Sequence, residues 1–119
     1  MAPVAGTHKP LWQDGWYRFA RHLASPNFGL RPANAHIDLI VIHAISLPPG
    51  QFDTGQVQRL FTNTLDWAAH PYFGTIRDLK VSAHFFITRS GKLWQFVSTQ
   101  HRAWHAGASA YREIGRAHV

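Results

Sequence analysis

The residues best suited to chemistry in this sequence are histidines that end or interrupt apolar segments. His43 directly follows an apolar run at 39–42 that is rich in β-branched residues, and it precedes a Pro-Pro-Gly turn at 48–50. A short apolar run of this composition predicts a strand that is buried on both faces. Because α/β proteins place reactive groups at the ends of such strands, His43 is a candidate ligand or catalyst. The alternative is a histidine that is hydrogen-bonded at the rim of a core.

A second group of candidates lies further along the chain. Alternation in a predicted strand places His84 on its more polar face, which could floor a cleft; a histidine satisfied within the sheet is the alternative. His101 and His105 have the i, i+4 spacing of two metal ligands on a helix, but Gly107 favours an extended wall segment. Trp104 offers a flat apolar face and an N–H donor that suit a sugar ring, or it fills a core.

These side chains need a scaffold, and the sequence patterns predict one of helices and strands. Apolar residues at helical spacing predict short amphipathic helices that begin at Asp14 and at Asp53. Alternating residues predict strands at 81–88 and 93–97, joined by a tight Ser-Gly turn. Proline and glycine content predicts loops at 25–32 and 70–74.

Length and composition limit the class of protein. A chain of 119 residues, 45% of them hydrophobic, can form one small domain, and without cysteine it has neither disulfides nor thiolate chemistry. No apolar run has membrane-spanning length, so no membrane partner is expected. Residues 1–10 lack the apolar core of a secretion signal, which makes a cytoplasmic location the default expectation.

The net charge is positive, +6 from 12 Lys and Arg against 6 Asp and Glu. Such a charge could attract nucleic acid, which is one candidate function. The basic residues are scattered without a run, however, and no nucleic-acid module signature accompanies them. We therefore interpret them as a solvated surface and expect no nucleic-acid partner.

Five sequence blocks, in order, carry a family resemblance. They are Ile-Val-Ile-His-Ala-Ile-Ser-Leu-Pro-Pro-Gly at 40–50, Leu-Phe-Thr-Asn-Thr at 60–64, His-Pro-Tyr-Phe at 70–73, Val-Ser-Ala-His at 81–84 and Arg-Ala-Trp-His-Ala-Gly at 102–107. Over residues 13–112 the chain resembles the N-acetylmuramoyl-L-alanine amidases of the AmpD type. The resemblance implies an α/β fold, a mixed β-sheet with flanking helices, like that of amidases and peptidoglycan-recognition proteins.

The activity implied by the resemblance is zinc-assisted hydrolysis of the bond between the lactyl group of N-acetylmuramic acid and L-alanine. Zn²⁺ would be held by two histidines and an acidic residue, which leaves a position for the attacking water. His43 matches the first of these histidines. Trp104, His105 and Lys80 match substrate-binding positions; Lys80 stands where arginine is usual, which removes a bidentate contact to a peptide carboxylate. The implied partners are 1,6-anhydromuropeptides and other peptidoglycan fragments in the bacterial cytoplasm, bound by a monomer.

The remaining catalytic positions of the family lie downstream of the Arg-Ala-Trp-His-Ala-Gly block. They are the second histidine, the acidic ligand, a lysine that supports the oxyanion and a glutamate that moves the proton. None has a match in this sequence, so we expect no catalytic residue in the chain, no stoichiometric zinc and a C-terminally truncated domain. A non-catalytic muropeptide-binding module is the alternative, because proteins of the peptidoglycan-recognition fold can lose zinc ligands and keep the groove.

The predicted boundaries are a mobile tail at 1–12, a partial amidase domain at 13–112 and a foreign segment at 113–119. Residues 114–119, Ile-Gly-Arg-Ala-His-Val, match the translation of a common sequencing adapter, which can also encode part of Glu113. The last segment is therefore predicted to be adapter read-through and not part of the fold.

Overall fold

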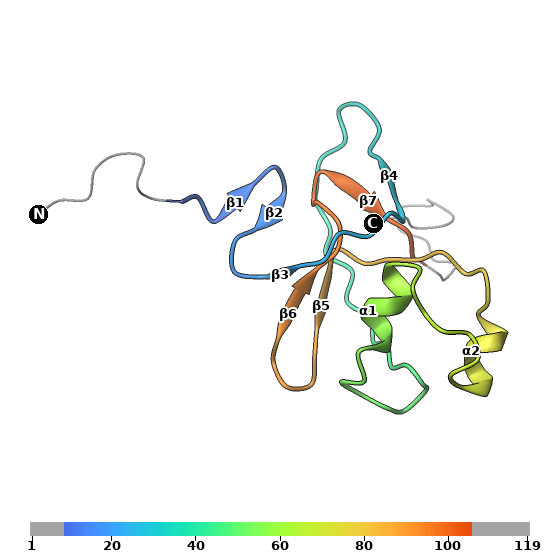
Figure 1. Ribbon diagram of the computed structural model, residues 1–119. Helices are drawn as coiled ribbons and strands as arrows, with labels where there is room; N and C mark the ends of the chain where they lie inside the picture. Colours follow the sequence, from blue (N-terminus) through green and yellow to red (C-terminus); the bar gives the residue numbers. More distant parts are fainter. Residues whose placement is uncertain (1–8, 106–119) are drawn as a thin grey trace, which may run out of the picture.

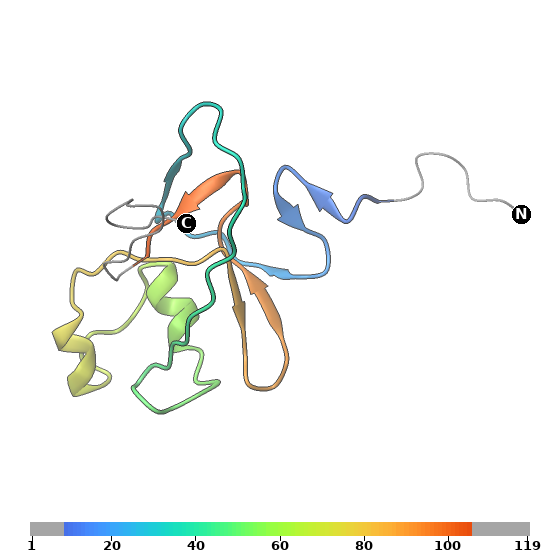
Figure 2. The ribbon, with the colours of Figure 1, turned by 180° about the vertical axis from the view of Figure 1, so that it is seen from behind.

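The structure of the protein is a computed structural model, which describes residues 9–105. In chain order its elements are β1 (Trp12–Gln13), β2 (Trp16–Tyr17), β3 (Arg21–His22), β4 (Phe28–Leu30), α1 (Gln56–Phe61), α2 (Pro71–Thr75), β5 (Phe85–Ile87), β6 (Leu93–Gln95) and β7 (His101–Ala103). Figure 1 shows the β1–β2 hairpin at one side and α2 at the other, with α1 and the β5–β6 hairpin between them. Figure 2 shows the same order from behind.

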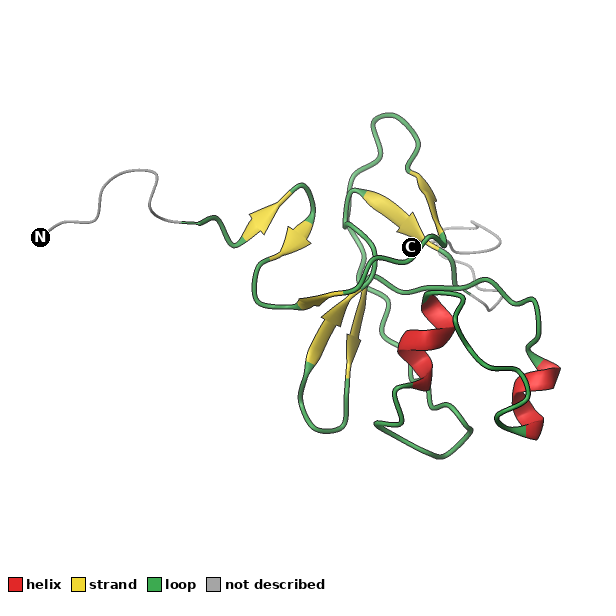
Figure 3. Ribbon diagram, in the orientation of Figure 1, coloured by secondary structure: helices red, strands yellow, loops and turns green. Residues whose placement is uncertain are grey.

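The strands form three small sheets, which Figure 3 shows separated by long loops. β1 pairs with β2, and β4 pairs with β7, both antiparallel. In the third sheet β6 lies in the middle, parallel to β3 and antiparallel to β5. The predicted mixed sheet with helices beside it is therefore confirmed.

The β5–β6 hairpin forms where the sequence predicts it, with shorter strands. Its turn is closed by Thr88, whose N–H donates to the Lys92 carbonyl at 2.9 Å, and Gly91 takes the left-handed φ of +86° that the turn requires. The Asp53 carboxylate accepts the backbone N–H groups of Arg89 and Ser90 at 2.9 and 3.0 Å. The hairpin tip is thereby tied to the loop that precedes α1.

The helix predicted from Asp14 is wrong, because residues 12–22 form β1, β2 and β3 instead. Asp14 and Gly15 have φ of +52° and +82°, the backbone of a tight hairpin turn. The buried amide of Gln95 then fixes the hairpin: it accepts the Tyr17 N–H at 2.7 Å and donates to the Gly15 carbonyl at 2.8 Å. An Asp-Gly pair is itself a hairpin signal, and it outweighs the helical spacing of the apolar residues.

The buried strand predicted at 39–42 is also wrong. The segment has no strand in the structure, and its apolar side chains are exposed, Ile40 to 82% and Ile42 to 90%. A strand needs a neighbour that takes up its N–H and C=O groups. Among residues 9–105 no strand pairs with this segment, so its composition alone does not make it a strand.

The second predicted helix is confirmed as α1, with Val57, Leu60 and Phe61 buried as its apolar face requires. It begins at Gln56 after Gly55, and Asp53 does not cap it because its carboxylate is used by the hairpin turn. The loop predicted at 70–74 is wrong: it holds the short helix α2, where His70 accepts the Tyr72 N–H on Nδ1 at 3.0 Å. α1 packs on the core formed with Phe73, Phe96 and Val97.

The loop predicted at 25–32 contains the strand β4, and a buried polar residue just before this strand fixes its position by hydrogen bonds. Asn27, 1% exposed, donates to the Val81 carbonyl and to the Asn63 side chain at 2.9 and 2.8 Å. Its own carbonyl accepts the hydroxyl of Ser82. These bonds fix β4 against the segment that leads into β5, and β4 in turn positions β7.

Candidate metal and substrate site

The structure brings together two of the predicted site residues, His43 and His105. Their ring centroids lie 4.6 Å apart with the planes at 80°, edge to face. Partial burial of the His43 ring, and secondarily the nearby His105, lower the pKa of His43 below its ordinary value. The neutral imidazole is the form that binds metals, so this environment favours a ligand.

The position of Trp104 is set by backbone hydrogen bonds on both sides. Its carbonyl accepts the Ser82 N–H at 2.8 Å, and its N–H donates to the Ser82 hydroxyl at 3.1 Å. Pairing of β4 with β7 places Gly29 beside its indole, whose Nε1 lies 3.6 Å from where a Cβ on Gly29 would stand. The indole is half-buried, so it combines a fixed position with an accessible edge.

Lys80 lies near the same segment but has a different environment. It is exposed and directly precedes the buried pair Val81 and Ser82. Because Ser82 is bonded to Trp104, the backbone at Lys80 is only two residues from the one that positions the indole. Its predicted contact to substrate stays a prediction.

The His84 side chain is hydrogen-bonded within the protein, which agrees with the alternative of a histidine whose polar atoms are used inside the sheet. Its Nε2 lies 2.7 Å from the carbonyl of His101, which ties the residue just before β5 to β7. Burial lowers the pKa of His84; the hydrogen bond to His101 opposes this, and the charge of Arg31 adds to it. His101 in turn stacks on Phe28, with ring centroids 4.9 Å apart, so His101 and His105 belong to an extended segment and not to a helix. Gly107, which favoured that interpretation, lies outside the described residues.

The residues that the structure describes do not make a complete metal site. Within 9–105 there is no group of three or more His, Cys, Asp or Glu side chains that could hold an ion. A catalytic zinc ion takes three protein ligands and an open position, and His43 with His105 would supply two imidazoles at most. The donor set seen here therefore does not fit zinc without further ligands.

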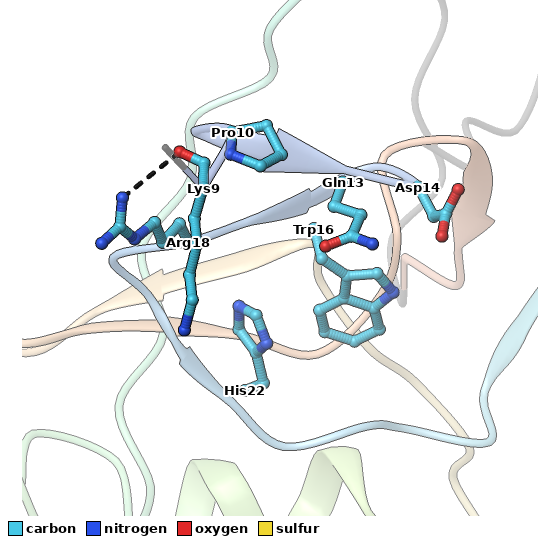
Figure 4. Close-up of a pocket in the computed structure, with 7 residues that line it drawn as sticks. All are labelled: Lys9, Pro10, Gln13, Asp14, Trp16, Arg18 and His22. Atoms are coloured by element: carbon cyan, nitrogen blue, oxygen red, sulfur yellow. Dashed lines mark hydrogen bonds between the residues drawn. The ribbon is translucent and has the colours of Figure 1, made fainter. Parts of the chain in front are cut away.

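An open pocket of about 450 Å³ lies beside the β1–β2 hairpin (Figure 4), and neither His43 nor His105 lines it. It is lined by Lys9, Pro10, Gln13, Asp14, Trp16, Arg18 and His22. The Trp16 and His22 rings lie 5.0 Å apart, and Arg18 donates to the Lys9 carbonyl at 3.3 Å. Sequence reasoning missed this pocket, which the turn at Asp14 and Gly15 would have revealed had it been recognised as a hairpin.

The fold and the residues gathered at Trp104 identify the class of protein. The family profile of N-acetylmuramoyl-L-alanine amidase matches residues 33–119, and the chain belongs to that family. Its predicted α/β amidase fold is confirmed by similarity to solved structures. A crystal structure of a selenomethionine AmpD derivative matches with a TM-score of 0.84 at 46% identity, over 90% of this chain and 60% of that one. A solution structure of Citrobacter freundii AmpD matches with a TM-score of 0.56 at 46% identity, over 90% and 57%.

Among curated relatives, the chain is similar to 1,6-anhydro-N-acetylmuramyl-L-alanine amidase AmpD. The Citrobacter freundii protein is 47% identical over 102 residues, which cover 86% of this chain and 54% of that protein. The Escherichia coli K12 protein is 46% identical over 102 residues, covering 86% and 56%. The chain thus spans about half the length of the curated relatives it matches.

Two other sequence predictions bear on the organisation of the chain. Neither helix within residues 9–105 has the length and apolar character to cross a bilayer. The predicted tail at 1–12 is described only from residue 9, and the predicted read-through at 113–119 lies outside the described residues.

Proposed function

We propose that this chain forms part of a zinc-dependent 1,6-anhydro-N-acetylmuramoyl-L-alanine amidase, a monomeric cytoplasmic enzyme that recycles peptidoglycan fragments. The observation that carries the proposal is the edge-to-face pair of His43 and His105, 4.6 Å apart, at the end of the segment that positions Trp104. The relatives named as this amidase are 46–47% identical over 102 residues. Their length supports the further proposal that hydrolysis needs ligands outside residues 9–105.

Each predicted site residue takes a role that suits its environment. His43, whose pKa is lowered by partial burial of the ring and secondarily by His105, is one metal ligand. Trp104 is a fixed, half-buried platform for the sugar ring, and His105 holds the substrate beside it. Lys80 is an exposed cation two residues before Ser82, which is bonded to Trp104, and it meets a carboxylate of the peptide.

The proposal is tested with the chain alone and with a chimera. The 119-residue protein should release no L-alanine-containing peptide from anhydromuropeptide, with or without added zinc. A chimera that joins residues 1–112 to the downstream part of Citrobacter freundii AmpD should release it. His43→Ala should abolish that activity, whereas His36→Ala, which removes an exposed histidine from the same segment, should leave it.

Two results would count against the proposal. Hydrolysis by the 119-residue chain would show that no further residues are needed. A folded chimera that binds anhydromuropeptide without cleaving it would favour a binding module instead.

A further inference from the structure

Two arginines and an indole share one face of the β4–β7 ribbon. Gly29 pairs directly with Arg102 across the ribbon, and alternate residues of a strand share a face. Gly29 and Arg31 therefore face the same way as Arg102 and Trp104. A Cβ on Gly29 would lie 3.3 Å from a terminal nitrogen of Arg102 and 3.6 Å from the indole Nε1. The guanidinium and the indole N–H thus lie side by side over a residue without a side chain.

The Arg31 side chain donates one hydrogen bond through its Nε, and its terminal nitrogens have no acceptor among residues 9–105. Its Nε donates to the Thr99 carbonyl at 3.1 Å, and a terminal nitrogen lies 3.5 Å from His84 Nε2. The same Nε2 lies 2.7 Å from the His101 carbonyl, and a carbonyl only accepts, so this nitrogen carries the proton. It cannot also accept from Arg31. Within residues 9–105 the terminal nitrogens of Arg31 therefore have no acceptor.

Arg102 is in a similar position. Its Nε is buried and has no hydrogen-bond partner, which is costly for a charged group. The carboxylates of Asp53 and Asp66 are bonded to backbone N–H groups. Burial, and secondarily the charge of Arg102, lower the pKa of Arg31. Two partly buried cations thus lie close together with unused donors.

We infer that Arg31, Arg102 and the indole N–H of Trp104 form a binding site for a carboxylate group. A guanidinium presents parallel N–H donors that match the two oxygens of a carboxylate, and the indole adds a third direction of approach. Because Gly29 has no side chain, the Arg102 guanidinium and the indole N–H can lie over the ribbon at this position. The site goes beyond the proposed amidase role, in which Trp104 offers its ring face to a sugar. The carboxylate belongs to an external ligand such as a peptide.

The test is a nuclear magnetic resonance titration of the 119-residue chain with glutarate, and with the neutral analogue glutaramide as control. The Arg102 Nε–H and Trp104 Nε1–H resonances, assigned with Arg102→Lys and Trp104→Phe, should shift saturably with glutarate only. Gly29→Ala keeps both charges and displaces Arg102, so it should weaken binding several-fold. Arg31→Gln should weaken binding about tenfold or more, as loss of a charge-assisted hydrogen bond predicts. Arg77→Gln, which changes an exposed arginine, should have no effect.

Absence of saturable shifts in the wild-type chain would overturn the inference. Equal weakening by Arg31→Gln and Arg77→Gln would also overturn it, because it would indicate general charge attraction only. The wild-type titration decides even if a variant fails to fold.

Discussion

Gly15→Ala should destabilise the protein strongly, because two independent costs coincide at this residue. Gly15 has φ +82°, and a Cβ there would lie 2.1 Å from the Ser98 Oγ and 2.9 Å from the backbone nitrogens of Thr99 and Gln100. The left-handed backbone costs about 1–2 kcal/mol for a residue with a Cβ. Overlap with backbone adds about 1–3 kcal/mol. The sum is about 2–5 kcal/mol, large against a typical total stability of about 5–15 kcal/mol.

Gly50→Ala is the matched control for this prediction. Gly50 also has a left-handed φ, +77°, but nothing lies within 4 Å of the position of its Cβ. It should therefore lose only the backbone part, about 1–2 kcal/mol. Urea unfolding followed by circular dichroism measures both losses. Equal losses for the two variants would refute the close approach of the β1–β2 turn to residues 98–100.

Three further predictions follow from single contacts. Asp53→Ala should lower the free energy of unfolding by about 1–3 kcal/mol, because the Arg89 and Ser90 N–H groups lose their acceptor; urea unfolding measures it, and an unchanged midpoint would contradict it. The pKa of His84 is lowered in the folded state, whereas in the unfolded chain this histidine has its ordinary pKa of about 6.5. Below that pH the unfolded chain therefore binds more protons than the folded protein, and the free energy of unfolding should fall as pH drops through about 6.5. His84→Gln should reduce this slope, and His36→Gln should not. Ile40→Lys, at a side chain 82% exposed, should change stability by less than about 0.5 kcal/mol and reduce self-association in sedimentation experiments; a large loss of stability would mean that the segment is buried.

The sequence predicted the elements whose causes are local. The turn of the β5–β6 hairpin and the buried face of α1 are encoded in a few neighbouring residues, and both form as expected. The β1–β2 hairpin was also locally encoded, in Asp14 and Gly15, but a competing helical pattern obscured it.

The errors lie where structure depends on distant partners. β4 exists because Phe28 pairs with Ala103, and no local pattern announces that pairing. The segment at 39–42 has the composition of a strand, yet composition does not supply the hydrogen-bonding neighbour that a strand requires. Pattern reasoning therefore predicts which residues favour a strand, and tertiary contacts decide whether one forms.

The candidate site shows the same division. Resemblance identified His43, Lys80, Trp104 and His105 one by one, but spacing alone could not place His105 against His43. That contact depends on the pairing of β7 with β4. The position of β4 in turn depends on the buried hydrogen bonds of Asn27. The pair Arg31 and Arg102 was not predicted, because the sequence does not show which of their N–H groups lack a hydrogen-bond acceptor in the folded protein.

The most direct test of the central claim, that His43 is a metal ligand of an amidase, is the zinc content of the chimera after dialysis. The chimera and its His36→Ala variant should each retain zinc in stoichiometric amount, and His43→Ala should lose most of it. The 119-residue chain alone should retain little. Full zinc retention by a folded His43→Ala chimera would contradict the account.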